Sequence, residues 1–418
     1  MKRIALFLIL VLCLSGCSRE LPGYTLNTNT EDDVVNETPH ISGEVQSNRE
    51  YTIYPVDQPA DHIVGNYYYY ANSQIVSYYD VEIQRRVVLC SQPNCTHSAE
   101  ECTAFLGSAH QVKYQVVGDI AYALINDNPN GGKVQIISPN LVSGERKVLW
   151  DLTPKGENTC MENMDFSIDK TTMFISFCQY ERVLEDNVYR EKNKASYAYA
   201  LDLTTGENEL LFKSKIPYHP DFSFTGDSLV PQVCTEEFLF IYDMEDFAEM
   251  PISEEEYYKK NPAGDYWDYV GDFWPDGAYY SVNRETGVRT RICEAAATFQ
   301  DLYGPVRDRK LSFTDGDTVY IYDGRTGQIT QCFTQENMGM QIYKDGRIIY
   351  NVGKTDGGYD YFWYDLTTGD TQQFQSGIDL MTFSISEETA DYFIGYYKGS
   401  NRYIPKQDWY NENYDAAF

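Results

Sequence analysis

Asp202-Leu203-Thr204-Thr205-Gly206-Glu207 is a short stretch that returns almost unchanged as Asp365-Leu366-Thr367-Thr368-Gly369-Asp370, and each copy ends a run of alternating aromatic and apolar residues. The Asp side chain can bond to the backbone two residues on, and the Gly four positions later accepts the left-handed conformation of a bulged hairpin loop. Each copy therefore predicts a hairpin between two strands. A hairpin that recurs once per sheet indicates an all-β repeat protein.

Three further stretches keep the same spacing between an Asp or Asn and a turn Gly. They are Asn140 with Gly144, Asn283 with Gly287 and Asp323 with Gly327, and a degenerate copy ends at Asp80 with Gln84 in the Gly position. The last two intervals between copies, 40 and 42 residues, match the roughly 40–45 residues of a four-stranded propeller blade. The longer intervals then require insertions.

These repeats predict an all-β fold over residues 50–418, a β-propeller of seven blades that are each a four-stranded antiparallel sheet. Six or eight blades are the alternatives for the count, and a pair of stacked sandwiches is the alternative architecture. The strands expected after the last turn, at residues 381–386, 392–398 and 402–405, leave the final blade one strand short. We expect residues 50–56 to supply that strand and close the ring, because closure removes exposed sheet edges.

The first residues contain the three parts of a secretory signal. Lys2 and Arg3 precede an apolar run over residues 4–14, which is too short for a membrane span. Leu14-Ser15-Gly16-Cys17 resembles the lipobox of bacterial lipoproteins. The resemblance implies a signal peptide over residues 1–16, a lipid on Cys17 and a location on the extracytoplasmic face of the cell membrane. An ordinary cleaved signal with an incidental Cys is the alternative.

Residues 17–49 are rich in Asn, Thr, Glu and Ser and predict a disordered tether, because they offer little apolar surface to bury. The whole chain has 63 acidic against 33 basic residues and a formal net charge of −30. Nucleic acid is therefore excluded as a partner, since phosphate binding needs a basic footprint. A glycan, a cation or a protein partner remains compatible with this charge, and we expect a monomer.

The densest set of metal-capable side chains is Cys90, Cys95, His97 and Cys102, which fall within thirteen residues. Thiolates and an imidazole suit tetrahedral zinc, and a corner at Pro93-Asn94 would bring the four together. Their spacing is not that of a standard zinc finger.

Two alternatives to a metal stay open for these cysteines. Export favours a disulfide that pins the loop leaving the first blade, and free buried thiols are the other alternative. With a disulfide, one Cys of the three either stays free or reaches another Cys of the chain. The other cysteines considered are Cys160, Cys178, Cys234, Cys293 and Cys332.

The insertion at residues 243–278 is acidic and aromatic, and it accounts for the longest interval between turns. Aromatic faces beside carboxylates can stack on sugar rings, hold cations or dock a partner. Residues 253–260 have capping-box spacing and predict a short helix. The alternative is that the insertion folds over its own blade. The ligand-binding candidates are Tyr266, Trp267, Asp268, Phe273, Trp274 and Asp276.

The Asp-x-x-Thr-Gly turn after a strand is similar to the repeats of quinoprotein-type and TolB-like propellers. The Trp residues by which quinoprotein blades dock are not seen, so the resemblance does not extend to a quinone cofactor, and a second domain such as that of TolB is not seen either. The cysteine signature between Leu89 and Phe105 resembles that of β-propeller lipoproteins of anaerobic Firmicutes.

The motifs G-x-S-x-G and H-E-x-x-H and a glycine-rich phosphate loop are missing from the sequence. We therefore expect a non-catalytic, membrane-anchored extracytoplasmic propeller that binds a ligand or protein partner at the cell surface. A carbohydrate-active enzyme, either a lyase or a glycoside hydrolase with carboxylates in the propeller funnel, is the alternative. An envelope sensor or assembly factor of the TolB kind is a third hypothesis.

Overall fold

The computed structural model describes residues 62–64, 67–69, 74–80, 85–97, 101–107, 109, 111–128, 132–156, 158–185, 188–213, 228–243, 252, 254–262, 269, 278–294, 309–355, 357–374 and 384–418. The expected signal peptide, Cys17, the tether at 17–49 and the expected closing strand at 50–56 lie outside the described residues. The same holds for the six ligand-binding candidates of the insertion, Tyr266, Trp267, Asp268, Phe273, Trp274 and Asp276.

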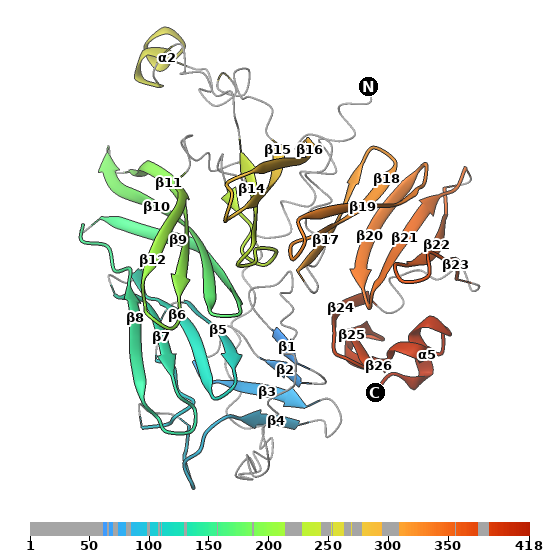
Figure 1. The fold of residues 1–418 in the computed structure, drawn as a ribbon, viewed down its shortest axis with the longest axis horizontal. Helices are drawn as coiled ribbons and strands as arrows, with labels where there is room; N and C mark the ends of the chain where they lie inside the picture. The colour runs from blue at the N-terminus through green and yellow to red at the C-terminus, as the bar shows by residue number, and fades with distance from the viewer. Residues whose placement is uncertain are drawn as a thin grey trace. The chain divides into compact units, whose positions relative to one another are not determined.

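The described strands form seven antiparallel sheets, here called sheets 1 to 7, that follow one another along the chain (Figure 1). Sheet 1 contains β1 (His62–Val64), β2 (Tyr67–Tyr69), β3 (Ser77–Asp80) and β4 (Arg85–Val88), and sheet 2 contains β5 (Gln111–Val117), β6 (Ile120–Asn126), β7 (Val134–Pro139) and β8 (Arg146–Asp151). Sheet 3 contains β9 (Thr159–Asp169), β10 (Thr172–Glu185), β11 (Val188–Asp202) and β12 (Asn208–Lys213).

The four remaining sheets complete the described part of the fold. Sheet 4 contains β13 (Ser228–Leu229), β14 (Phe238–Asp243), β15 (Ala278–Asn283) and β16 (Arg289–Glu294), and sheet 5 contains β17 (Lys310–Asp315), β18 (Thr318–Asp323) and β19 (Gln328–Thr334). Sheet 6 contains β20 (Met338–Lys344), β21 (Arg347–Gly353), β22 (Tyr359–Asp365) and β23 (Thr371–Gln373), and sheet 7 contains β24 (Ser384–Glu388), β25 (Tyr392–Tyr397) and β26 (Ser400–Pro405). Within each sheet, every strand pairs with the strand that precedes or follows it in the chain. The prediction of an all-β fold built from antiparallel hairpins is therefore confirmed.

The repeated turn connects the last two strands of its sheet. The Asp202 Oδ1 atom accepts hydrogen bonds from the backbone N–H groups of Thr204 (2.7 Å) and Thr205 (2.8 Å), and Gly206 has a φ of 77°. Asn140, Asp323 and Asp365 bind the backbone N–H groups two and three residues on in the same way. A side-chain oxygen and a left-handed Gly therefore set the hairpin of each of these sheets.

Each sheet packs face to face on the next one through apolar side chains. Val112 and Tyr114 of β5 lie in one buried cluster with Val76 beside β3, and Ile136 of β7 clusters with Met164 of β9. A third cluster holds Phe174, Phe240 and Phe313 and joins sheets 3, 4 and 5. A fourth cluster joins sheet 5 to sheet 6, and a fifth joins sheet 6 to sheet 7. A sheet covered on both faces must be apolar on both, which explains why strands such as β21 are buried at successive positions.

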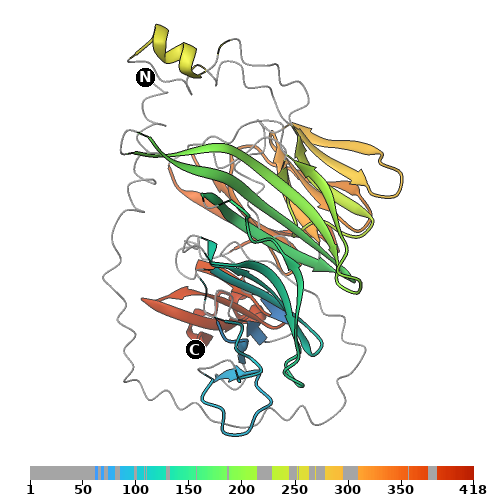
Figure 2. The same ribbon diagram turned by 90° about the vertical axis from the view of Figure 1, so that its left-hand side faces the viewer.

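Sheet 3 is longer than its neighbours. Its strands β10 and β11 have 14 and 15 residues and appear as the two long green strands in Figure 2. The interval of 62 residues between Asn140 and Asp202 is one of those that predict an insertion. The structure instead places much of the extra length in the hairpin strands themselves, which still pair beyond the bulge between Gln179 and Glu181.

In the described part of the chain, three short helical segments accompany the sheets. The helix predicted within the insertion is confirmed as α2 (Glu254–Lys260), where Lys260 pairs with Glu256. After β26 the chain forms α5 (Lys406–Tyr410) and the 3-10 turn η2 (Tyr414–Ala416), which we did not predict. Among the described residues, the structure contains no helix with the length and apolar character needed to cross a membrane.

The segment after β26 covers part of sheet 7. Trp409 of α5 is 1% exposed and stacks edge-on against Phe374 and Phe393. The backbone of Tyr403 in β26 exchanges two hydrogen bonds with Phe418, at 2.9 and 3.1 Å. The C-terminal residue of the chain is thus paired with β26 at Tyr403.

Arg309 connects sheets 3, 4 and 5 through its buried guanidinium group. Its Nη1 atom donates to the Ser167 hydroxyl (2.8 Å) and to the carbonyl oxygens of Gln232 (2.9 Å) and Cys234 (3.1 Å). Burial lowers the pKa of Arg309, and the carboxylate of Asp169 opposes that shift. A buried guanidinium is tolerated here because its N–H donors reach several carbonyl acceptors.

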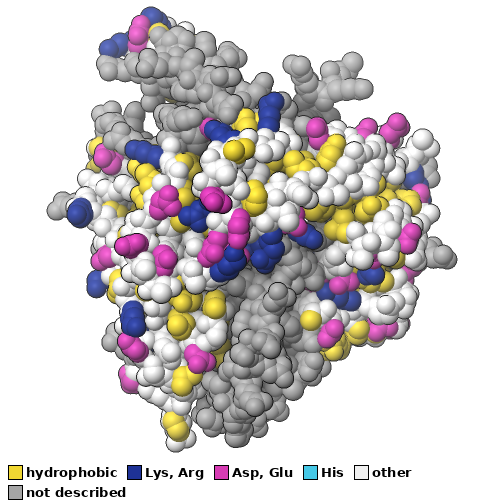
Figure 3. Space-filling model, in the orientation of Figure 1, with side chains coloured by type: hydrophobic (Ala, Val, Ile, Leu, Met, Phe, Trp, Pro, Cys, Tyr) yellow, Lys and Arg dark blue, Asp and Glu magenta, His cyan; other side chains and the backbone are white. Residues whose placement is uncertain are grey.

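The side chains of Lys and Arg lie among those of Asp and Glu on the face drawn in Figure 3. Ion pairs of the described residues include Lys170 with Glu237 (2.5 Å) and Arg284 with Glu209 (3.2 Å). Each of these pairs has at least one exposed side chain, so it contributes little to the free energy of unfolding. The surface of this face therefore carries charges of both signs.

Candidate metal centre

Residues 89–107 connect β4 of sheet 1 to β5 of sheet 2, and both ends of this connection bind the same short segment before β3. The Leu89 N–H donates to the Val76 carbonyl (3.0 Å), the Val76 N–H to the Ala104 carbonyl (2.9 Å), and the Leu106 N–H to the Gln74 carbonyl (2.7 Å). The two ends of the connection are therefore held close together. This places Cys90, near the start, beside Cys102, near the end.

The residues between the two ends reverse direction at the expected Pro93-Asn94 corner. Asn94 and His97 both have a φ of 58°, in the left-handed region that L residues seldom adopt. The strained backbone at His97 directs its N–H to the Cys95 sulfur at 3.4 Å.

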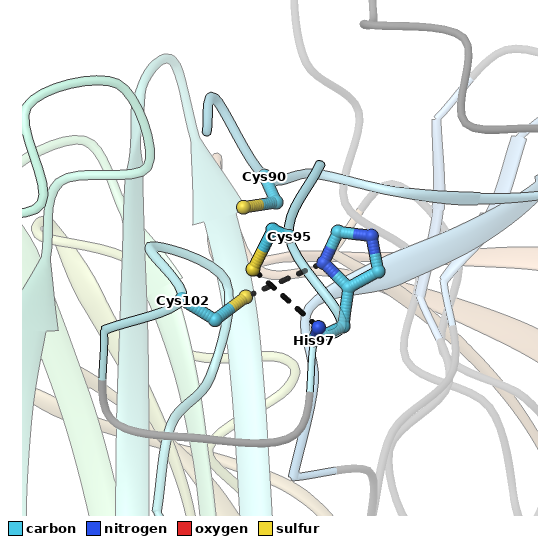
Figure 4. Close-up of side chains that lie close together, drawn as sticks. All are labelled: Cys90, Cys95, His97 and Cys102. Atoms are coloured by element: carbon cyan, nitrogen blue, oxygen red, sulfur yellow. Dashed lines mark hydrogen bonds between the residues drawn. The ribbon is translucent and has the colours of Figure 1, made fainter. Parts of the chain in front are cut away.

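The four predicted ligands come together in this connection. The three Sγ atoms and a ring nitrogen of His97 all lie within 4.8 Å of one another, and Cys102 Sγ lies 3.5 Å from His97 Nδ1 (Figure 4). In the described part of the chain, no other group of three or more His, Cys, Asp or Glu side chains has this arrangement. The cluster is therefore capable of holding a metal ion.

The centre has a buried side and a solvent side. Cys90 and Cys102 are 3% and 1% exposed and belong to the apolar cluster between sheets 1 and 2. Cys95 and His97 are half-buried, and the residues around them at the corner are exposed. The ligands thus lie at the edge of a core, where a bound ion would be shielded on one side only.

The two buried thiols differ in acidity. Burial raises the pKa of Cys90, but hydrogen bonds from the Gln92 N–H, from Thr103 and from Cys102 oppose this and bring it down to about 6. Burial and the neighbouring Cys90 and Cys95 side chains together raise the pKa of Cys102 to about 12, and the hydrogen bond from the Ala104 backbone opposes this rise. Without a metal, Cys90 is therefore the more acidic of these two buried thiols.

Contacts from sheet 2 hold the connection in place. The Nη2 atom of Arg146, the first residue of β8, donates to the Cys102 carbonyl (3.0 Å) and to the Phe105 carbonyl. The Ser91 N–H donates to the Thr103 hydroxyl (3.0 Å), and the Ser91 hydroxyl donates to the Val142 carbonyl (2.8 Å). Arg146 was not among the predicted site residues, because only the pairing of distant strands shows which carbonyls it meets.

The donor set fits zinc better than it fits the other metals considered. Three thiolates and an imidazole are a known tetrahedral zinc set, with Zn–S distances of about 2.3 Å, which corresponds to about 3.8 Å between sulfurs. Ligand atoms already within 4.8 Å of one another need only a small inward movement to reach this geometry. Mg²⁺ and Ca²⁺ prefer oxygen ligands and do not suit these sulfurs.

All eight cysteines of the described residues are free thiols. Cys178, Cys234 and Cys293 are buried in their own sheets, and burial raises the pKa of Cys234 to about 12. Cys160 and Cys332 are half-buried and bond only weakly to backbone carbonyls, at 3.9 and 3.8 Å. None of these five belongs to the cluster of Cys90, Cys95 and Cys102.

No protein-family model matches the chain, and no curated protein matches it. Solved structures that are similar include oligogalacturonate lyase from Vibrio parahaemolyticus, at 8% identity and a TM-score of 0.44 over 86% of this chain and 92% of that one. A prolyl endopeptidase matches at 10% identity and a TM-score of 0.41 over 70% of this chain, which spans 40% of the endopeptidase. The β-propeller domain of the Trilobed protease from Pyrococcus furiosus matches at 10% identity and a TM-score of 0.32, over 60% and 70% of the two chains.

Proposed function

We propose that this chain is a lipid-anchored extracytoplasmic β-propeller of seven blades that binds a ligand or a protein partner, and that a zinc ion in the Cys90–Cys102 connection holds its first two blades together. The observation that carries the proposal is the convergence of four zinc-type ligand atoms within 4.8 Å. The seven consecutive antiparallel sheets support the blade count. The lipobox-like residues that end at Cys17 support the anchor.

The zinc ion has a structural role in this proposal. Cys3His sites with four protein ligands have no coordination position left for a substrate, and their metal stabilises the fold. Here the ligands lie between sheet 1, which has short strands, and sheet 2, whose Arg146 binds the same connection. Zinc would therefore reduce the conformational freedom of the connection and fix sheet 1 against sheet 2.

The zinc part is tested by elemental analysis of protein purified without chelators, together with a count of free thiols after denaturation. We expect one zinc ion per chain, no zinc in Cys102→Ser, and full zinc in Cys160→Ser, whose thiol lies outside the cluster. Eight free thiols and no metal in the reduced protein would refute the zinc centre.

The lipid anchor is tested by detergent phase partitioning of membranes. The natural chain should enter the detergent phase, and Cys17→Ala should enter the aqueous phase because it has no residue to carry the lipid. A Cys17→Ala protein that still partitions with the membranes would contradict this part of the proposal.

Ligand binding is tested by a glycan array combined with a pull-down from membranes. If the insertion carries the site, replacing residues 244–277 by a short turn should remove binding and leave the folded sheets intact. Unchanged binding would place the site elsewhere. Glycans that are shortened on the array would identify a carbohydrate-active enzyme instead of a binding protein.

A further inference from the structure

We propose that Cys95 and Cys102 form a reversible disulfide that expels the metal when a disulfide oxidant reaches the centre. The cluster would then be a redox-controlled zinc switch, and the metal-bound and disulfide forms would be two states of one site. This inference rests on the zinc centre proposed above.

The pairing of Cys95 with Cys102 follows from the contacts among the sulfurs. The Cys102 side chain interacts with both Cys90 and Cys95, and all three Sγ atoms lie within 4.8 Å of one another. A disulfide bond requires an S–S distance of about 2.05 Å, so one sulfur must move. Cys95 is half-buried against the apolar cluster and sits next to the exposed corner at Pro93-Asn94, whereas Cys90 and Cys102 are fully buried within that cluster. Cys95 is therefore the sulfur that moves.

Exposure also makes Cys95 the point of attack. It is half-buried and is flanked by the exposed residues Asn94 and Thr96, while Cys90 and Cys102 are 3% and 1% exposed. A thiolate attacks a disulfide only where the two sulfurs can meet in line. A small disulfide from solvent therefore reaches Cys95 first, and Cys102 is in position to complete the reaction.

The reaction balances as thiol–disulfide exchange. The Cys95 thiolate attacks one sulfur of the oxidant, forms a mixed disulfide and releases the first thiolate of the oxidant. The Cys102 thiolate then attacks the Cys95 sulfur, forms the Cys95–Cys102 bond and releases the second thiolate. Two electrons pass from the two cysteines to the oxidant disulfide. The zinc ion leaves because only Cys90 and His97 remain as ligands.

The connection stays attached at both ends in either state. The hydrogen bonds from Arg146 to the Cys102 carbonyl and from the Ser91 N–H to Thr103 involve no ligand sulfur. Oxidation would thus change the corner at residues 92–97, which faces solvent, and preserve the packing of sheets 1 and 2. The switch would therefore change the binding of a molecule that contacts this corner.

The experiment treats the zinc-loaded full chain in detergent with glutathione disulfide. Released zinc is followed with a chromogenic chelator, and the linkage is identified by peptide mass mapping. We expect release of one zinc ion per chain together with a Cys95–Cys102 linkage, and recovery of the zinc-bound form after reduction and addition of zinc. Retention of zinc, or release with no linkage between Cys95 and Cys102, would overturn the proposal.

Two variants separate this result from general oxidation. Cys160→Ser removes a half-buried thiol outside the cluster and should release zinc at the natural rate with the same linkage. Cys95→Ser should lose the intramolecular linkage, because Cys90 and Cys102 are shielded from the oxidant. A Cys90–Cys102 linkage that forms in Cys95→Ser as fast as the Cys95–Cys102 linkage forms in the natural chain would contradict the role of Cys95. A chain that takes up no zinc at all would refute the zinc centre and not the exchange chemistry.

Discussion

The guanidinium group of Arg146 donates a hydrogen bond to the backbone carbonyl of Cys102 at 3.0 Å, and so sheet 2 directly orients a residue of the metal centre. The same Nη2 atom also binds the Phe105 carbonyl. Arg146 thus holds the last turn of the connection in the position from which Cys102 faces Cys90 and Cys95. Groups that orient metal ligands affect metal affinity even though they do not touch the metal.

Arg146→Met should therefore weaken zinc binding without removing a ligand. We expect the Kd for zinc to rise by roughly 10-fold or more, as for other groups that orient metal ligands. A competition titration against a chelator of known affinity measures this change. Lys147→Met is the matched control, because the Lys147 side chain is 65% exposed and pairs with the exposed Glu145. Equal zinc affinities of the two variants would show that Arg146 does not position the site.

In the metal-free centre, the Cys90 thiol should lose its proton slightly below neutral pH. The pKa of Cys90 is lowered to about 6 and that of Cys102 is raised to about 12, so of these two thiols Cys90 should ionise between pH 5 and pH 8. The ultraviolet absorbance of thiolate, followed in reduced protein without zinc, should rise with a midpoint near 6. Cys90→Ser should lose this step, and Cys332→Ser should keep it because the pKa of Cys332 is raised to about 11.

As the pH rises, ionisation of these two thiols changes the free energy of unfolding of the reduced, metal-free chain in opposite directions. Because the folded-state pKa of Cys90 lies below the value of 9.0 for a free thiol, its contribution is present above pH 9 and is lost as the pH falls through 6. The folded-state pKa of Cys102 lies above 9.0, so its contribution is present below pH 9 and is lost as the pH rises toward 12. Chemical unfolding between pH 6 and 9 should therefore show a rise in stability that Cys90→Ser lacks.

The sequence predicted the turns well because they depend on local chemistry. The Asp202 carboxylate reaches backbone N–H groups two and three residues away, and a left-handed Gly follows, so the pattern is complete within six residues. The clustering of Cys90, Cys95, His97 and Cys102 was similarly suggested by their short spacing. Arg146 and Arg309 could not be found this way. Their partners lie more than 40 residues away, and only the packing of sheets brings them together.

Gly324 illustrates a second kind of constraint that only the packing shows. It follows Asp323 in the repeated turn, but a Cβ atom built on it would lie 2.1 Å from the carbonyl oxygen of Val233 in the preceding sheet. Its own carbonyl accepts a hydrogen bond from the Thr235 hydroxyl at 2.7 Å. The two backbones are thus too close for any side chain at this position.

Gly324→Ala should consequently separate sheet 5 from the segment at Val233. We expect a loss of roughly 3 kcal/mol or more in the free energy of unfolding, as for other substitutions that overfill a packed site. Gly316→Ala is the control, since its φ of 59° costs about 1–2 kcal/mol for an L residue while no atom lies within 4 Å of the new Cβ. If the two variants unfold at the same denaturant concentration, the close approach of Gly324 to Val233 is not a constraint on the fold.

Asp365 combines the repeated turn with an ion pair, and this distinguishes it from Asp202. Its Oδ1 atom accepts the N–H of Thr367 (2.8 Å), and its Oδ2 atom accepts a bond from Arg347 Nε (3.2 Å). Arg347 in turn stacks on Trp363 and on Tyr410 of α5, with its guanidinium carbon 4.7 and 4.2 Å from the ring centroids. The Asp365 charge therefore helps to orient the arginine on which the C-terminal helix packs.

Asp365→Asn should keep the turn and lose the ion pair, because Asn140 forms the same turn with an amide oxygen. We expect a loss of about 1 kcal/mol at neutral pH. Asp202→Asn should be close to neutral, because Asp202 has no Arg partner among the residues that the structure describes. Burial raises the pKa of Asp365, but the N–H groups of Thr367 and Thr368 and the charge of Arg347 outweigh it, so the pKa is lowered. The contribution of this carboxylate is therefore present above its unfolded pKa of about 4 and is lost as the pH falls through the lower folded value. Urea unfolding of the natural chain and of Asp365→Asn should accordingly give free energies of unfolding that converge as the pH falls below 4. A difference in this free energy that stays constant down to pH 2 would show that the charge of Asp365 has no part in the effect.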